Sequence, residues 1–435
     1  MQVLIYTEQI TPRLAYTAEI LLSQLSGMAC QIISDKRQFE AYEGPRLNYS
    51  LQPFTEKNLW IPPHGLLAET GIRVQTCTPT QQEQVPAFFS TTQAGTDFSF
   101  DVFAASFYLL SRYEEYLPAP RDAHGRFGAT SSLAWQQGFL QRPIVQEWAQ
   151  LLAKALQSKY PALPVKPVAY TFQPSYDIDL AWAYGHRPWW RNAAAIGADF
   201  AKGRLQILRN RIAVALGAAD PFFTFSYLEN VHERYDLQPV FFFLLGNYGA
   251  YDKNISHRHR PFRELIARLA AQHAVGIHPS YAAFEDPVQL AEEVARLADI
   301  AGQRVVRSRQ HFLRLRFPET YRELLAVGIE ADYSLGYADQ PGFRAGMAAP
   351  FFWYDLEREQ KTKLQLHPFQ VMDVTLQQYL RLPAKAAAGA VKTLSDQVRS
   401  TGGTFTTLWH NSSFSPLHGW AGWQEVYEQI LENSR

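Results

Sequence analysis

Residues 168–410 alternate between strand-length apolar runs and longer segments with helical spacing, and this alternation limits the possible folds more than any other feature. Residues 168–172 and 239–245 are apolar runs of the kind expected for strands buried on both faces. Residues 261–273 and 285–302 have the 3.6-residue periodicity of helices packed on a core. Repeated β–α units predict an α/β fold, with either a parallel barrel or a doubly wound sheet.

The reactive side chains of this region fall where predicted strands end. In parallel α/β folds, function gathers at the carboxyl ends of the strands. Further predicted strands end near residues 278, 308, 332 and 410, and the side chains at or just past the strand ends are those of Asp177, Asp179, His278, Arg309, His311, Asp332 and His410. We expect these side chains to meet at one mouth of the fold.

Asp177 and Asp179 are two residues apart, so within a strand they share one face and repel each other. Such a pair is tolerated when it is solvated, or when a cation or a shared proton relieves the repulsion. A lone Asp-X-Asp is more often a surface turn, but histidines at neighbouring strand ends favour a functional site over a turn. Carboxylate and neutral imidazole both bind divalent metals, which predicts a metal site with one aspartate as ligand and the other as general base.

The length of 435 residues favours two domains. A helical pattern ends near Tyr160, and three prolines follow before the first strand of the β–α region. We therefore predict an N-terminal α/β module of unknown role at residues 1–160 and a second domain at residues 166–435. The module has no cluster of reactive side chains, and we expect Glu114 and Glu115 to lie on a solvated helix face.

Composition excludes several classes of protein. Lys plus Arg and Asp plus Glu are 41 each, so no global field attracts nucleic acid or an anionic membrane. The two cysteines give no disulfide framework. The first residues have no basic segment typical of a signal peptide, and no apolar run approaches the ~20 residues of a membrane-spanning helix. We expect a cytoplasmic protein, with homo-oligomers left open.

Four short motifs resemble the polysaccharide deacetylase family, whose catalytic unit is the NodB homology domain (carbohydrate esterase 4-like). They are "SYDID", "GIHPSY", "SRQHF" and "TFTTLWHN". Two further stretches, "EADYSLGYADQPGFRAG" and "FDVFAASFYLLSRYEEYL", resemble a bacterial subgroup in which that domain follows an uncharacterised module. The resemblance implies a distorted (β/α)7 barrel, preceded by the smaller α/β domain, and a hydrolase that removes N- or O-acetyl groups from glycans with a divalent metal.

The resemblance also implies roles for single residues. Asp177 matches the catalytic base, acting on a metal-bound water as nucleophile, and Asp179 matches the metal-binding aspartate. His278 matches the first metal histidine. His410 matches the general acid, and Arg309 matches the arginine that positions the base. Asp373 is a candidate for holding the tautomer of His410, or for a structural role.

One departure from the family pattern concerns the second metal histidine. It is usually found four residues after the first, where this chain has Ala282. His311 is our replacement ligand, against the alternative of a hydrogen-bonded core histidine. Candidate substrate contacts are Tyr281, Trp409 and Arg344, and for Arg344 a salt bridge that shapes its loop is an equal alternative.

The resulting prediction is a metal-dependent hydrolase that cleaves C–N bonds of non-peptide amides, with an acetylated carbohydrate as substrate. Zinc is favoured as its single metal, with iron, cobalt or nickel as alternatives. A second hypothesis is a catalytically degenerate relative that only binds glycan. A third is a metal-free glycosidase that pairs Asp177 with Asp332 or Asp373, which requires carboxyl groups about 5–10 Å apart. The sequence does not identify the glycan or decide between N- and O-deacetylation.

Overall fold

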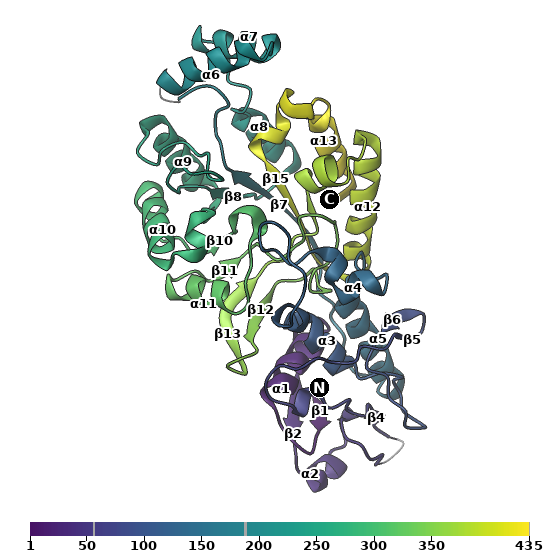
Figure 1. Cartoon of the computed structure of the whole chain (residues 1–435). Helices are drawn as coiled ribbons and strands as arrows, with labels where there is room; N and C mark the ends of the chain where they lie inside the picture. Colours follow the sequence, from purple (N-terminus) through teal and green to yellow (C-terminus); the bar gives the residue numbers. More distant parts are fainter. Residues whose placement is uncertain (55–56, 187–188, 435) are drawn as a thin grey trace.

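The computed structural model describes residues 1–54, 57–186 and 189–434. Its N-terminal part contains a four-stranded parallel sheet (Figure 1). The strand order is β2 (Cys30–Ile33), β1 (Val3–Tyr6), β3 (Arg46–Asn48) and β4 (Leu59–Trp60). The other elements of this part are α1 (Pro12–Ala18), α2 (Lys36–Ala41), the hairpin of β5 (Thr80–Gln82) and β6 (Val85–Ala87), α3 (Val102–Leu110), α4 (Leu133–Gln136) and α5 (Ile144–Lys159).

A nine-stranded sheet forms the centre of the C-terminal part. Its order is β12 (Phe351–Asp355), β13 (Gln360–Leu366), β11 (Ala331–Asp332), β10 (Arg307–Ser308), β9 (Ala274–Ile277), β8 (Val240–Phe243), β7 (Tyr170–Ile178), β15 (Gly403–His410) and β14 (Val371–Met372). Only β12 and β13 pair antiparallel, and all other neighbours are parallel. The predicted α/β class is therefore confirmed.

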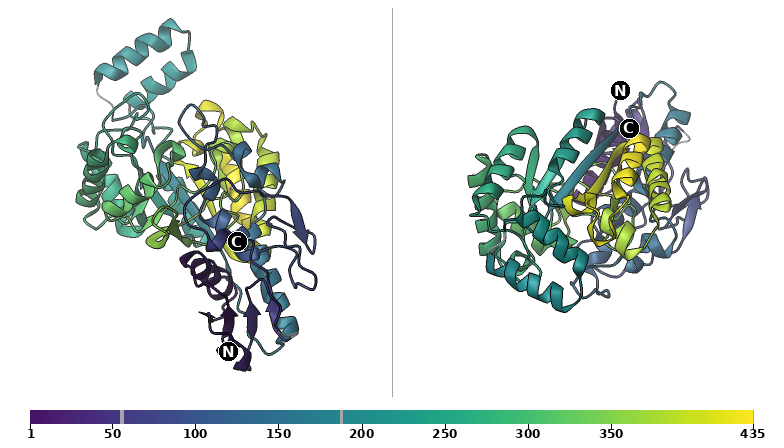
Figure 2. Two further views of the ribbon diagram at one scale, coloured as in Figure 1. Left: turned by 60° about the horizontal axis from the view of Figure 1, so that its bottom comes forward. Right: turned by 90° about the horizontal axis from the view of Figure 1, so that it is seen from above.

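Helices lie around the outside of this sheet (Figures 1 and 2). They are α8 (Phe225–Tyr235), α9 (Arg260–Gln272), α10 (Pro287–Ala301), α11 (Glu319–Ala326), α12 (Ala384–Thr401) and α13 (Trp423–Ser434). Two more helices, α6 (Trp189–Ala201) and α7 (Leu205–Ala215), project beyond the others at the top of Figure 1. No helix among the described residues is long and apolar enough to cross a lipid bilayer.

Local sequence explains the elements that the periodicity predicts. All four residues of β8 are buried, as expected for an apolar strand covered on both faces. The side chain of Asp286 accepts hydrogen bonds from the first backbone N–H groups of α10, and Gly302 ends that helix with a φ of +65°. The sequence predicts less of the antiparallel hairpin of β12 and β13, which interrupts the β–α alternation.

The short chain segment that connects β13 to β14 requires the sheet to curl. Leu366 at the end of β13 pairs with Asp332 of β11, and Val371 at the start of β14 pairs with Thr407 of β15. In a flat sheet, β13 and β14 would lie seven strand spacings apart, which is about 34 Å. Five residues of extended chain cover at most about 18 Å, so the two sides of the sheet bend toward each other.

The N-terminal part packs directly on the C-terminal part. One hydrophobic core runs through both. Backbone hydrogen bonds also cross between them, from Val145 N–H to the Gly346 carbonyl and from Phe343 N–H to the Leu140 carbonyl. The hydroxyl of Tyr16 donates to the Phe352 carbonyl at 2.8 Å. The N-terminal part is thus joined to the larger sheet by a shared core and by hydrogen bonds.

Glu114 and Glu115 are buried, which contradicts the expected solvated helix face. Glu115 accepts hydrogen bonds of 2.8 Å from Nε of Arg112 and from Nε of Arg344. Arg112 also bonds Glu114 at 2.8 Å. The segment is a short 3-10 turn after α3, and the two arginines compensate the buried carboxylate charges. The expectation of solvent exposure was wrong because it considered only the polarity of the two glutamates.

Candidate metal centre and its pocket

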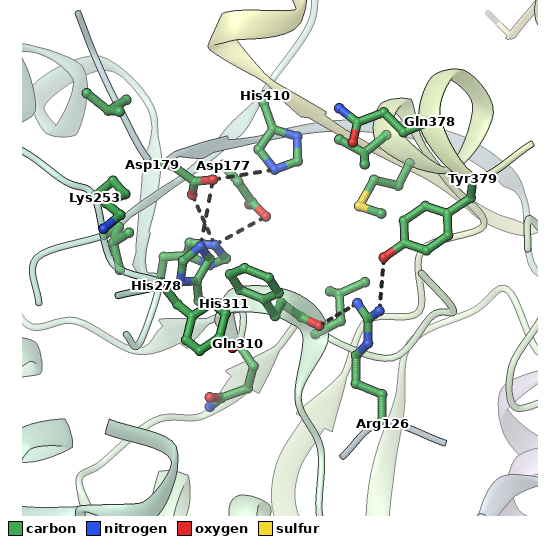
Figure 3. Close-up of a pocket in the computed structure, with 17 residues that line it drawn as sticks. Arg126, Asp177, Asp179, Lys253, His278, Gln310, His311, Gln378, Tyr379 and His410 are labelled. Atoms are coloured by element: carbon green, nitrogen blue, oxygen red, sulfur yellow. Dashed lines mark hydrogen bonds and ion pairs between the residues drawn. The ribbon is translucent and has the colours of Figure 1, made fainter. Parts of the chain in front are cut away.

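A cavity of about 550 Å³ lies at the carboxyl ends of the central parallel strands (Figure 3). Five of the predicted site residues line it: Asp177, Asp179, His278, His311 and His410. Asp177 and His410 belong to β7 and β15, Asp179 and His278 directly follow β7 and β9, and His311 lies three residues after β10. These five side chains meet at one mouth as expected, although they are up to 233 positions apart in the sequence. Arg309 and Asp332, which were expected there too, are fully buried and do not line the cavity.

Asp179, His278 and His311 form a group that could hold a metal ion. One ligand atom from each lies within 4.8 Å of the others. Asp179 Oδ1 is 3.4 Å from Nε2 of His278, and Asp179 Oδ2 is 3.8 Å from Nε2 of His311. Asp179 Oδ1 is also buried without a hydrogen-bond partner among the described residues. A carboxylate whose two oxygens face two imidazole nitrogens, one of the oxygens being buried and unbonded, fits the donor set of a divalent cation.

Hydrogen bonds on the far side of each imidazole orient it toward Asp179. Nδ1 of His278 is 2.6 Å from the Arg309 carbonyl, so Nδ1–H donates and Nε2 is left to face the cavity. Nδ1 of His311 is 3.0 Å from Oδ1 of Asp252. Such outward hydrogen bonds fix the tautomer and ring orientation of metal-binding histidines. The departure at Ala282 is thus compatible with a metal centre that uses His311.

Arg309 holds Asp177 in place. Its guanidinium is fully buried and donates to Asp177 Oδ1 at 2.9 Å, to Ser175 Oγ at 2.7 Å and to the Tyr333 carbonyl at 3.0 Å. Asp177 Oδ2 is 3.7 Å from Nε2 of His278. One oxygen of Asp177 is therefore fixed by Arg309, while the other faces the cavity. The charge of Arg309 also reduces the repulsion between Asp177 and Asp179.

The imidazoles and carboxylates of this group shift each other's titration. Burial alone raises the pKa of Asp179, but His311, followed by His278 and His410, holds it well below its usual range. Burial lowers the pKa of His278, and Asp177 and Asp179 raise it above its ordinary value. A cluster of carboxylates that draws positive charge onto its histidines is the electrostatic environment that also attracts a cation.

His410 is oriented by Asp373, which is fully buried. Nδ1 of His410 is 3.0 Å from Asp373 Oδ1, and its backbone N–H donates to Asp373 Oδ2 at 2.7 Å. Burial lowers the pKa of His410, but Asp373, with smaller contributions from Asp179 and Asp177, raises it to about 10. Nε2 is 3.8 Å from Asp179 Oδ2 and so lies on the cavity side. The pair therefore presents a protonated imidazole to the pocket.

The predicted substrate contacts do not line the cavity. Trp409 precedes His410 on β15, so its side chain lies on the opposite face, where it stacks on Phe414. Arg344 is buried and forms a salt bridge with Glu115, which agrees with the alternative role predicted for it. Tyr281 lies just behind the wall, stacked at 4.2 Å on the cavity residue Tyr251.

Arg126 is a pocket residue that the sequence motifs do not include. It belongs to the N-terminal part, and it donates to the Phe312 carbonyl at 3.1 Å and to the Tyr379 hydroxyl at 2.9 Å (Figure 3). All three residues line the cavity. Asp252, which bonds His311, is likewise absent from the sequence motifs. Neither residue is at the end of a predicted strand, so only the folded chain reveals them.

Comparison with known proteins gives a family match for the N-terminal part alone. Residues 3–161 match a family of unknown function (DUF7033). Among curated proteins, none matches the sequence.

Three solved structures are similar over about three fifths of the chain. A protein described as a polysaccharide deacetylase from Mycobacterium smegmatis has 17% identity, a TM-score of 0.39 and coverage of 61% of this chain and 86% of its own. A polysaccharide deacetylase from Bacillus cereus has 13% identity, a TM-score of 0.29 and coverage of 60% of this chain and 86% of its own. An allantoinase has 11% identity, a TM-score of 0.36 and coverage of 61% of this chain and 83% of its own.

Proposed function

We propose that this chain is a metal-dependent hydrolase of the polysaccharide deacetylase type, which removes acetyl groups from a glycan or a sugar-linked substrate. The observation that carries the proposal is the arrangement of Asp177, Asp179, His278, His311 and His410 around one cavity. This cavity combines a candidate metal centre with a separately oriented carboxylate and a separately oriented imidazole. Hydrolysis of an amide or ester needs these three functions together.

A distorted (β/α)7 barrel of the NodB type is part of this proposal. Its support is the curl of the sheet, since the short link between β13 and β14 brings β11 and β15 toward each other. A barrel would place all carboxyl ends of the strands around one mouth. The active domain would then comprise residues 166–435, with residues 1–160 as a closely packed companion.

Asp179, His278 and His311 would hold the metal, and His278 and His311 would bind through Nε2 because each Nδ1 is engaged elsewhere. A divalent cation bound there would polarise the acetyl carbonyl and lower the pKa of water. The preference for zinc, iron, cobalt or nickel follows from the mixed carboxylate and imidazole donors. The protein's contribution is the orientation of these donors.

Asp177 acts as the general base in this scheme. Arg309 fixes one of its oxygens, and the other accepts a proton from the attacking water. The water oxygen forms a bond to the carbonyl carbon of the acetyl group. His410 then donates its Nε2 proton to the departing nitrogen or oxygen of the sugar as the bond from the carbonyl carbon to that atom breaks. The products are acetate and a free amine or hydroxyl group.

The geometry disfavours the two alternatives. In a glycosidase, Asp332 or Asp373 would have to face the substrate, but both are buried and engaged, Asp332 with two serines and Asp373 with His410. A protein that only binds glycan has no use for a charged imidazole held by Asp373 or for a carboxylate held by Arg309. The orientation of both Asp177 and His410 favours a catalytic protein over one that only binds glycan.

Acetate release tests the proposal. Purified protein is reconstituted in turn with zinc, cobalt, iron and nickel, and offered a panel of N- and O-acetylated sugars and oligosaccharides. We expect metal-dependent acetate release that falls by at least 100-fold in Asp177→Asn, which keeps the metal. Asp299→Asn, on the surface of α10, is the matched control and keeps full activity. Stoichiometric metal without acetate release from any substrate would favour the glycan-binding alternative.

A further inference from the structure

The hairpin of α6 and α7 projects away from the rest of the protein (Figures 1 and 2), and large apolar side chains on it are exposed. Phe200, Leu205, Ile212 and Leu216 are exposed by 71%, 63%, 44% and 83%. Leu205, Ile212 and Leu216 are separated by seven and four residues, which places them on one face of α7 and its end. Single exposed apolar residues are common, but several on one helix face mark a binding surface.

Polar contacts join the two helices of this hairpin. Arg211 of α7 is buried and donates to Asp199 of α6 at 3.1 Å and to Asn192 at 3.2 Å. The charged pair thus lies between the helices while leucine and isoleucine side chains face outward. Ile207 and Val214 of α7 pack inward, so this helix is apolar on its outer face as well as on its inner face. An apolar environment at the outer face of α7 would bury the exposed side chains.

The hairpin is also locally basic in a neutral chain. Residues 192–216 contain four basic residues and one acidic residue, Asp199. Lys202 and Arg209 are exposed beside the apolar side chains, and neither forms an ion pair with a described residue. Apolar residues flanked by Lys and Arg are typical of helices that lie in the surface of an anionic membrane.

Two cavities connect the hairpin with the metal pocket. The first, of about 450 Å³, lies under the hairpin and is lined by apolar side chains of both α6 and α7, with Trp182 and Phe223 opposite. It shares His186 with a second cavity of about 800 Å³. The second cavity contains Lys253, Arg258 and Arg296, and none of its described lining residues is acidic. It shares Leu180 and Lys253 with the metal pocket.

We propose that the α6–α7 hairpin is a docking element that binds the surface of an anionic lipid bilayer. The apolar side chains of α7 enter the headgroup region, and Lys202 and Arg209 contact lipid phosphates. The cation-lined cavity then lies between the membrane and the metal pocket. For the function proposed above, on which this consequence rests, the substrate is an acetylated sugar joined to lipid through a phosphate.

Vesicle flotation tests the docking without metal or substrate, so its result is independent of the proposed activity. The full chain is mixed with vesicles of phosphatidylglycerol and phosphatidylcholine, or of phosphatidylcholine alone. We expect it to float with the anionic vesicles and to remain mostly free with the neutral ones. The Leu205→Ser/Ile212→Ser/Leu216→Ser variant should bind at least tenfold more weakly. Val74→Ser/Val288→Ser, which removes exposed apolar groups elsewhere, should bind like the native chain.

A charge variant separates lipid binding from other uses of the apolar face. Lys202→Gln/Arg209→Gln should weaken binding to anionic vesicles by about fivefold for each charge and reduce its sensitivity to salt. Light scattering of all variants gives the oligomeric state. No flotation with anionic vesicles, or equal flotation of the serine variant, would overturn the proposal. So would a native dimer that the serine variant converts to a monomer, because the face would then join two copies of the chain.

Discussion

Nδ1 of His311 lies 3.0 Å from Oδ1 of Asp252, a residue in the loop between β8 and α9. The same carboxylate accepts a hydrogen bond from the Tyr281 backbone N–H at 2.8 Å. Asp252 therefore ties the segment after β9 to the segment after β10, and it orients the imidazole that we propose as the replacement for the histidine missing at Ala282. The proposed metal ligand thus has a supporting carboxylate of its own.

Elemental analysis of purified protein tests the ligand set. We expect about one divalent metal ion per chain, lost in Asp179→Ala, in His278→Ala and in His311→Ala, since each removes one of three donors. His257→Ala alters an imidazole further along the β8–α9 loop that does not line the pocket, and it should keep the metal. Full metal occupancy in His311→Ala would contradict the replacement of the second motif histidine.

Asp252→Asn tests the support of His311. The amide keeps the size of the side chain but removes the charge that orients and strengthens the imidazole. We expect the metal affinity, measured by competition with a chelator, to fall 10- to 100-fold. Asp286→Asn, at the exposed cap of α10, is the control and should leave the affinity unchanged. Equal affinities of Asp252→Asn and the native chain would show that Asp252 only shapes its loop.

Asp373→Asn tests the orientation of His410. The variant weakens the interaction that keeps the imidazole charged, so we expect kcat for acetate release to fall about 100-fold with little change in metal content. Ser413→Ala removes another hydrogen bond to Asp373 and leaves its contact with His410. If both variants lose activity equally, the role of Asp373 is structural rather than specific to His410.

Arg126→Met tests whether the N-terminal part contributes to substrate binding. Loss of the bonds to Phe312 and Tyr379 would loosen one wall of the pocket. We expect KM to rise about tenfold while kcat changes less than threefold, the pattern for a group that binds substrate and transition state alike. Arg260→Met, on the surface of α9, should change neither. A large drop in kcat alone would place Arg126 closer to the chemistry.

Glu115 links the stability of the protein to pH. Burial raises the pKa of its carboxyl, but Arg344 and Arg112 lower it to about 2. The unfolded chain titrates near its ordinary value of about 4.3, so folding favours the charged form by about 3 kcal/mol. This contribution is fully present above that value and is lost as the pH falls from about 4.3 to about 2.

Denaturant unfolding across this pH range measures the effect. Glu115→Gln should lower the free energy of unfolding by about 3–5 kcal/mol at neutral pH, because two buried arginines lose their charged partner. Its unfolding should also depend less on pH between about 2 and 5. Glu43→Gln, at an exposed carboxylate, is the control. An unchanged pH dependence in Glu115→Gln would contradict the low pKa.

Much of the fold and site was predictable where local patterns carry the information. Buried parallel strands read as apolar runs, and residues just past their ends share an edge, so Asp177, Asp179, His278 and His410 could be grouped in advance. The antiparallel β12–β13 hairpin was not predicted, because its interruption of the alternation depends on which strands it pairs with.

The sequence by itself determined the α/β class, the strand ends that carry the reactive groups and the positions of the caps of α10. These follow from periodicity and from side-chain chemistry within a few residues. The tertiary structure alone decided that Asp252 supports His311, that Arg126 reaches the pocket and that Glu115 is buried with Arg344. Each of these depends on partners 59 to 253 positions away. Contacts over such separations arise only when strands pair and the two parts of the chain pack, and no local pattern encodes them.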